Sequence, residues 1–123
     1  GLVAGAGGLL RLPRRLPYHV AMEALLTGDM IPASRAHAFG LVNDLVEPGT
    51  ALEAALKLAE KIAANGPLAV RTVKQVVTES QDWRVDDMFA LQNPRMAHIF
   101  SSEDAKEGAT AFAEKRAPVW KGK

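Results

Sequence analysis

The protein is a chain of 123 residues, of which 48% are hydrophobic and 24% are charged. These values are typical of one soluble globular unit and exclude two ordinary domains. The absence of cysteine excludes disulfides and thiolate metal sites, and a formal charge of +1, from 15 basic and 14 acidic residues, provides no field that would attract nucleic acid or an anionic membrane.

The chain opens within an apolar, glycine-rich phrase over residues 1–8 and has no initiator methionine. Arginines follow this phrase instead of preceding it, so its pattern is not that of a secretory signal, and no apolar run is long enough to span a bilayer. We therefore expect no targeting segment, a cytoplasmic location, and a sequence entered partway through a longer one.

Short helices are predicted over residues 18–26 and 33–39, after an apolar segment over residues 9–16. A proline lies near each expected helix start: Pro13, Pro17 and Pro32. Gly40 is placed as a C-terminal cap. One strand is predicted over residues 41–46, closed by a Pro-Gly turn. Because a lone strand has no partner for its backbone groups, it either pairs outside this chain or is an extended loop.

Three longer helices are predicted over residues 51–64, 68–80 and 85–100, with Thr50 as the N-cap of the first. In the second helix four valines are expected to face inward: Val70, Val73, Val76 and Val77. In the third, Pro94 removes a hydrogen bond and clashes with the carbonyl of Ala90, which predicts a kink or a break.

A last helix is predicted to begin after Ser102, a good N-cap followed by two acidic residues in the first turn. Lys115 and Arg116 are expected in its last turn, where the helix dipole favours cations, and Pro118 ends it. The chain is therefore expected to be almost entirely helical.

The opening Gly5-Ala6-Gly7-Gly8 lacks the third glycine of a dinucleotide-binding loop and the Gly-Lys-Ser/Thr ending of a phosphate loop. Two readings stay open at this point. The glycines form a flexible, close-packed turn, or they present backbone N–H groups at a helix N-terminus to an anion, an oxyanion or a water.

Other candidate side chains form no recognisable catalytic set. The three histidines are widely separated and favour surface or interface positions: His19, His37 and His98. The arginines at positions 11, 14 and 15 favour a solvated or salt-bridged face over an anion site. No metal site is predicted, and these features alone do not identify an activity.

Four phrases occur in order along the chain: Gly1-x-x-x-Gly5-Ala6-Gly7-Gly8-x-x-Arg11-Leu12-Pro13-Arg14, Ala21-Met22-Glu23-Ala24-Leu25-Leu26-Thr27-Gly28, Ala33-x-x-Ala36-x-x-x-Gly40-Leu41-Val42-Asn43, and Ser102-x-Asp104-x-x-Glu107-Gly108-x-x-Ala111-Phe112-x-Glu114-Lys115-Arg116-x-Pro118. Together they resemble the enoyl-CoA hydratase/isomerase (crotonase) family. The resemblance covers the C-terminal half of a family member. It implies an α/β crotonase-like parent with a ββα superhelix (the ClpP/crotonase fold), of which this chain is the mostly helical C-terminal half with about one short strand.

The resemblance also implies a division of the chain and roles for three residues. Residues 1–46 would end the crotonase core, and residues 47–123 would form a C-terminal helical region for oligomerisation. Gly5 resembles the residue whose backbone N–H helps to hold the catalytic water, which a side chain would crowd. Phe112 and Lys115 resemble the pair that approaches the adenine and phosphate end of coenzyme A, and residues three apart share a helical face. The alternative for Phe112 is core packing of the last helix.

The activity implied by the resemblance is that of an enoyl-CoA hydratase, which adds water to trans-2-enoyl-CoA in fatty-acid or acyl-CoA metabolism. No cofactor is expected beyond the coenzyme A carried by the substrate. The alternatives are a crotonase-fold isomerase, racemase-type enzyme or hydrolase, or a non-catalytic helical assembly module. The family's glutamates and oxyanion-hole donors lie in motifs upstream of Gly1, so this chain alone is expected to be inactive. A homo-oligomer, a trimer or a dimer of trimers, is expected.

Overall fold

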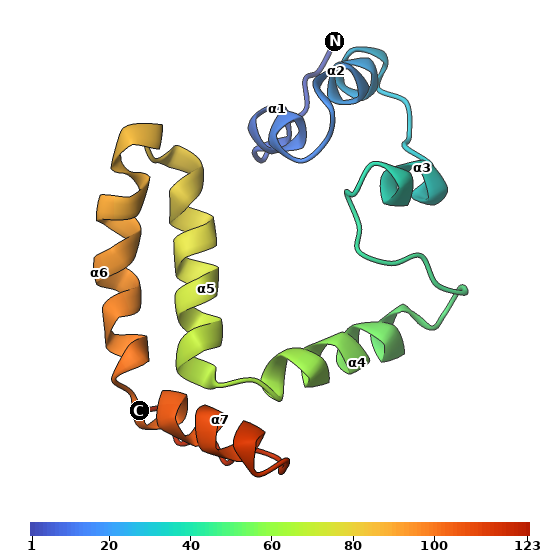
Figure 1. The fold of residues 1–123 in the computed structure, drawn as a ribbon. Helices are drawn as coiled ribbons and strands as arrows, with labels where there is room; N and C mark the ends of the chain where they lie inside the picture. Colours follow the sequence, from blue (N-terminus) through green and yellow to red (C-terminus); the bar gives the residue numbers. More distant parts are fainter. The chain divides into compact units, whose positions relative to one another are not determined.

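The computed structural model describes residues 1–123, and all of its regular elements are helices (Figure 1). They form two compact units, residues 1–51 and residues 52–123. None of the helices is long and apolar enough to cross a lipid bilayer. The helical character expected from the abundance of alanine is confirmed.

The first unit contains short helices around a small core. Its elements are α1 (Gly8–Arg11), the 3-10 turn η1 (Leu12–Arg14), α2 (Tyr18–Thr27) and α3 (Ala33–Ala38). Leu16, Val20 and Ala21 are buried together at its centre. The helices predicted over residues 18–26 and 33–39 are confirmed to within one residue at their ends.

A charged pair joins α2 to α3. Arg35 donates from Nη1 and Nη2 to the two carboxylate oxygens of Glu23, at 2.8 and 2.7 Å. The Arg35 guanidinium also lies 5.7 Å from the ring centroid of Phe39. These hydrogen bonds lower the pKa of Glu23. The pair is a structural link between two helices, because both of its ends are bound within the unit.

The end of α3 follows the Schellman pattern, in which a left-handed residue closes the helix. Gly40 has a φ of 75°, and its N–H donates to the His37 carbonyl at 2.9 Å. The Leu41 N–H donates to the Ala36 carbonyl at 2.8 Å. The cap predicted at Gly40 is therefore confirmed.

The strand predicted over residues 41–46 is wrong. These residues form bends and irregular backbone, and all of them are exposed. A strand needs the backbone groups of a neighbouring strand, and this chain contains no other strand to supply them. Of the two alternatives, the extended loop describes this chain.

The second unit is built on a helical hairpin. Its elements are α4 (Ala51–Ala63), α5 (Pro67–Glu79), the 3-10 turns η2 (Ser80–Asp82) and η3 (Val85–Asp87), α6 (Met88–Phe100) and α7 (Glu103–Ala113). The helices α5 and α6 run side by side in opposite directions (Figure 1). The three predicted long helices are confirmed, except that the third begins as a 3-10 turn.

Of the kink or break predicted at Pro94, the break is wrong, because α6 continues through this residue. Pro94 offers no N–H to the carbonyl four residues earlier. The neighbouring turn is supported from the side by Arg95, which donates from Nη1 to the Leu91 carbonyl at 2.6 Å and from Nε to Glu79 at 2.7 Å. Its guanidinium lies 4.9 Å from the centroid of the Trp83 ring. Arg95 thus bonds a carbonyl near the proline and ties α6 to α5.

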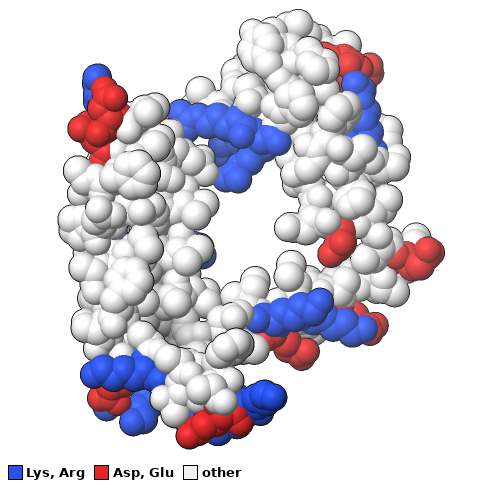
Figure 2. Space-filling model, in the orientation of Figure 1, with Lys and Arg blue, Asp and Glu red and all other residues white.

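The valine face of α5 is more exposed than the sequence predicts. Val70 and Val76 are half-buried, but Val73 and Val77 are 62% and 58% exposed, so the inward placement is wrong for these two. Val73 and Val77 line an open apolar groove of about 330 Å³ between α5 and α6. Figure 2 shows the viewed face of this hairpin almost free of charged side chains between its two ends.

Candidate functional site

The glycine turn at the start of the chain leads directly into α1. Ala6 and Gly7 both have positive φ, 51° and 88°. The Gly8 N–H donates to the Gly5 carbonyl at 2.9 Å, and the Arg11 N–H donates to the Gly7 carbonyl at 2.9 Å. None of these bonds uses the N–H of Gly5, which is an exposed residue. Ala6 and Gly7, two consecutive left-handed residues, therefore turn the backbone between Gly5 and the start of α1.

Gly5 stands in open space within this chain. A Cβ built on it would have no neighbouring heavy atom within 4 Å. Crowding inside the chain therefore does not account for glycine at this position. At Gly7 the positive φ itself favours glycine, and a Cβ there would lie 3.2 Å from Nε of Arg11.

The remaining candidates from the sequence do not converge. All three histidines are exposed, and so are the arginines at positions 11, 14 and 15. No group of three or more histidine, aspartate or glutamate side chains lies close enough to hold a metal ion. The glycine turn and the end of α7 therefore remain the candidate functional sites of this chain.

The last helix has a defined start and end. Ser102 Oγ accepts the Ala105 N–H at 3.0 Å, so the predicted N-cap is confirmed. The helix ends at Ala113, which leaves Lys115 and Arg116 beyond it, and their predicted place in the last turn is wrong. The physical reason is a second Schellman turn that begins before these residues.

In this turn Lys115 has a φ of 56°. Its N–H donates to the Phe112 carbonyl at 3.2 Å, and the Arg116 N–H donates to the Ala111 carbonyl at 3.0 Å. Lys115 thus occupies the left-handed position that Gly40 occupies after α3. For a residue with a Cβ this conformation costs about 1 kcal/mol or more.

Phe112 and Lys115 do not share a helical face, because Lys115 lies outside the helix. Phe112 is 88% exposed, so the alternative of core packing does not hold within this chain. Lys115 is also exposed and forms no ion pair. The end of α7 therefore presents an exposed aromatic ring and an unpaired cation within four residues of each other.

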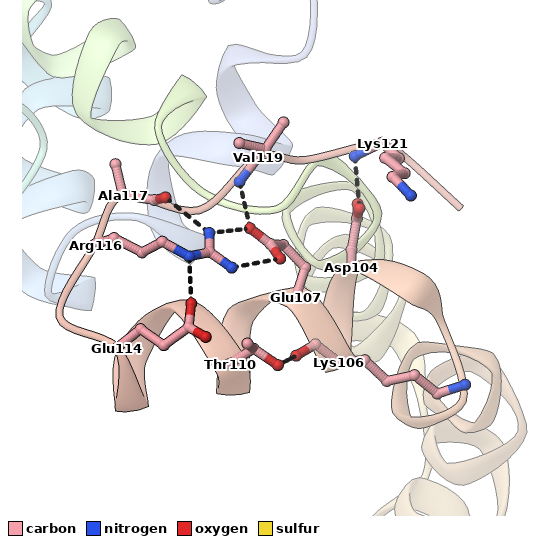
Figure 3. Close-up of polar contacts among 9 residues, drawn as sticks. All are labelled: Asp104, Lys106, Glu107, Thr110, Glu114, Arg116, Ala117, Val119 and Lys121. Atoms are coloured by element: carbon pink, nitrogen blue, oxygen red, sulfur yellow. Dashed lines mark hydrogen bonds and ion pairs between the residues drawn. The ribbon is translucent and has the colours of Figure 1, made fainter.

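The residue after Lys115 is held by two carboxylates (Figure 3). Arg116 Nη1 and Nη2 donate to the two oxygens of Glu107 at 2.6 and 3.0 Å, and its Nε donates to Glu114 at 2.6 Å. Glu107 also accepts the Val119 N–H at 2.8 Å. These bonds, the one from Arg116 first, lower the pKa of Glu107 to about 2, and they raise the pKa of Arg116.

Asp104 on α7 and Trp120 in the tail itself also fix the C-terminal tail, residues 114–123. Asp104, 5% exposed, accepts the N–H groups of residues 121 and 122 at 2.7 and 2.9 Å. Trp120 donates from Nε1 to the Ala64 carbonyl at 2.8 Å, and a Cβ built on Gly108 would lie 3.3 Å from its ring. We refer to Asp104, Glu107, Arg116 and Trp120 as the tail clamp.

Sequence reasoning expected Asp104 in the first turn and Arg116 in the last turn of the helix, and it identified none of the contacts of the tail clamp. One signal was available, since Asp104 and Glu107 are three residues apart and share a face of the predicted helix. Their partners could not be identified from spacing. Only the reversal of the chain after α7 brings Arg116 back onto the face that carries Glu107.

The fold of this chain is found in solved structures of enoyl-CoA hydratases. It is similar to enoyl-CoA hydratase EchA1 from Mycobacterium marinum with a TM-score of 0.97 and 63% identity, over 100% of this chain and 49% of that one. The family model for enoyl-CoA hydratase/isomerase matches residues 1–123. The chain therefore belongs to the enoyl-CoA hydratase/isomerase family.

Two curated relatives are described as a hydratase and a dehydratase of CoA thioesters. Enoyl-CoA hydratase EchA19 from Mycobacterium tuberculosis is 44% identical over 91% of this chain and 42% of its own length. Carnitinyl-CoA dehydratase from Proteus mirabilis is 38% identical over 100% of this chain and 49% of its own length. The chain thus spans about half the length of the curated relatives that it matches.

Proposed function

We propose that this chain is the C-terminal half of an enoyl-CoA hydratase, which adds water across the double bond of a trans-2-enoyl-CoA in acyl-CoA metabolism. The observation that carries the proposal is the 63% identity over the whole chain to a structure described as an enoyl-CoA hydratase. Residues 1–46 would then complete the catalytic core, and residues 47–123 would form the helical region through which subunits assemble.

In this proposal the contribution of residues 1–46 to the reaction is the Gly5 N–H, which donates a hydrogen bond to the attacking water. The exposure of Gly5 supports this role, and none of the hydrogen bonds of the glycine turn uses its N–H. Water adds its hydroxyl group to the β-carbon and a proton to the α-carbon. The acid and base for that step, and the donors that stabilise the enolate-like thioester, would come from the other half of the enzyme.

The contribution of α7 would be recognition of coenzyme A. The exposed ring of Phe112 suits the adenine, and the unpaired ammonium of Lys115 suits a phosphate. The substrate would bring the coenzyme itself, so no further cofactor is proposed. The enzyme would work in the cytoplasm as a trimer or a dimer of trimers.

The test is a hydration assay of the full-length enzyme with crotonyl-CoA, followed by longer enoyl-CoA chains. We expect loss of the absorbance of the conjugated thioester and formation of the 3-hydroxyacyl product. Absence of turnover on every chain length would contradict the proposal.

The second candidate is an isomerase that moves the double bond of an enoyl-CoA, since the family model covers both activities. It is distinguished in the same assay with a 3-enoyl-CoA. An isomerase converts that substrate to the conjugated 2-enoyl product without taking up water. A third candidate, a non-catalytic assembly module, predicts neither reaction.

A further inference from the structure

We propose that Glu107 and Arg116 are positioning residues for coenzyme A recognition: their ion pair fixes the turn after α7 and thereby holds Lys115 in the orientation that meets the nucleotide. The inference rests on the proposed contact between Lys115 and the coenzyme. It concerns two side chains that do not themselves touch the ligand.

Lys115 adopts a backbone conformation that has to be held by other contacts. Its φ of 56° is one that residues with a Cβ rarely adopt. The turn after α3 has the same hydrogen-bond pattern, and there the left-handed position belongs to Gly40. Because lysine bears a steric cost in this conformation that glycine does not, contacts beyond the hydrogen bonds of the turn help to offset it.

The stabilising contacts converge on the next residue, Arg116. Its planar guanidinium meets Glu107 through two parallel bonds of 2.6 and 3.0 Å, a geometry that fixes direction as well as distance. Glu107 lies on α7 itself and also accepts the Val119 N–H from the tail (Figure 3). Lys115 therefore lies between the end of α7 and Arg116, whose side chain is bonded back onto α7 through Glu107.

The same ion pair leaves Lys115 available to a ligand. Arg116 bonds to both Glu107 and Glu114, and Lys115 forms no ion pair of its own. The ammonium therefore has no carboxylate partner, and the exposed ring of Phe112 lies three residues earlier in the sequence. A cation and an aromatic face together suit the phosphate and the purine of a nucleotide.

Two measurements on the full-length enzyme that contains this chain test the inference. Hydrogen exchange of the Arg116 N–H, which bonds to the Ala111 carbonyl, reports the turn, and calorimetric titration with coenzyme A reports recognition. Glu107→Gln should speed this exchange by roughly tenfold and weaken coenzyme A binding by about 3- to 10-fold, as loss of a charge-assisted pair implies. Lys115→Ala should weaken binding to a similar degree.

The matched control is Glu103→Gln, which makes the same chemical change on the same helix and breaks the contact with Lys121 instead. It should leave the exchange of the Arg116 N–H and the affinity for coenzyme A unchanged. Arg116→Lys is the second variant, because it keeps the charge but loses the two parallel bonds, and it should behave like Glu107→Gln.

Unchanged exchange in both Glu107→Gln and Arg116→Lys would overturn the positioning role. So would a loosened turn with unchanged affinity, if Lys115→Ala still weakens binding. If Lys115→Ala binds coenzyme A as the unmodified enzyme does, the proposed contact itself fails and the inference falls with it. The Lys115→Ala titration thus separates failure of the proposed contact from failure of the positioning role.

Discussion

At the scale of single residues, the turn after α7 combines an unfavourable backbone conformation with an exposed cation. Ala6 is the other non-glycine residue with positive φ, and it adjoins the candidate Gly5. Left-handed residues with a Cβ persist where surrounding contacts determine them, and they occur often at functional sites. The proposed function assigns a role to Lys115 itself, and Ala6 lies next to Gly5, to which it assigns another.

Replacing Lys115 by glycine should stabilise the chain while removing the cation. Glycine adopts positive φ without the steric cost that lysine bears, so we expect the free energy of unfolding to rise by about 1 kcal/mol. Lys115→Ala removes the same charge but keeps the Cβ, and its stability should stay close to that of the unmodified chain. Urea denaturation of both variants checks this, and a Lys115→Gly variant less stable than Lys115→Ala would contradict it.

Glu107 should make the stability of the chain depend on pH in the acid range. Its pKa falls from an ordinary 4.5 to about 2 in the folded chain, chiefly through the hydrogen bond from Arg116. Between these values the unfolded chain binds more protons than the folded one. The contribution of Glu107 to the free energy of unfolding is therefore fully present above pH 4.5 and is lost as the pH falls toward 2.

Thermal unfolding at pH 7, 4 and 3 measures this effect. The decline in Tm toward low pH should be smaller in Glu107→Gln, because glutamine does not titrate. Glu103→Gln is a useful comparison, since the hydrogen bond from Lys121 also lowers the pKa of Glu103, and this variant removes that second titrating group from the same helix while keeping Glu107. Identical dependence of Tm on pH in Glu107→Gln and the unmodified chain would show that protonation of Glu107 does not affect stability.

At the scale of elements, the tail clamp joins segments that are distant in the sequence. Trp120 bonds the carbonyl of Ala64 at the end of α4 and packs over Gly108 on α7. Trp120→Phe keeps an aromatic ring but loses the N–H, and it should lower stability by about 1 kcal/mol. Trp120→Ala also loses the packing and should cost roughly 2 to 4 kcal/mol, given that the ring is half-buried.

Urea denaturation followed by circular dichroism measures both Trp120 variants. Val119→Ala serves as the control, because that side chain is exposed and its backbone N–H, which bonds Glu107, is retained. Equal stability of Trp120→Phe and Trp120→Ala would mean that packing on Gly108 contributes nothing.

Local signals predicted most of the helices, and contacts between distant residues decided the exceptions. Ser102 and Gly40 act within a single turn, so their capping roles follow from the sequence. The continuity of α6 through Pro94 depends on Arg95 and its partner on α5, which local reasoning does not include. The position of Lys115 was missed for a related reason, because a lysine in place of glycine gives no local sign that the helix ends there.

At the scale of the whole molecule, the chain exposes more surface than compact units of its size. Two compact units with a combined mass of 13.2 kDa would expose roughly 7,700 Å² by the usual scaling. The chain exposes 9787 Å², and apolar residues such as Leu52, 73% exposed, contribute to it. The excess indicates that another part of the protein or another subunit covers helical faces of this chain. This agrees with a chain that spans about half the length of its relatives.

We therefore expect the purified chain to bind a dye for exposed apolar surface, such as anilinonaphthalene sulfonate, and to show no hydration of crotonyl-CoA. Adding the part of the Mycobacterium marinum protein that this chain does not cover should lower the dye fluorescence and, if the proposed function holds, produce hydratase activity. Gly5→Val separates the two effects. A Cβ at this position has no neighbouring atom within 4 Å, so the fluorescence should still fall. The valine would crowd the water, however, and activity should drop by roughly tenfold or more, on the order of a lost catalytic hydrogen bond. Turnover by the chain alone, or full activity of the Gly5→Val complex, would contradict the assignment of this chain as the half that holds the water but lacks the catalytic acids.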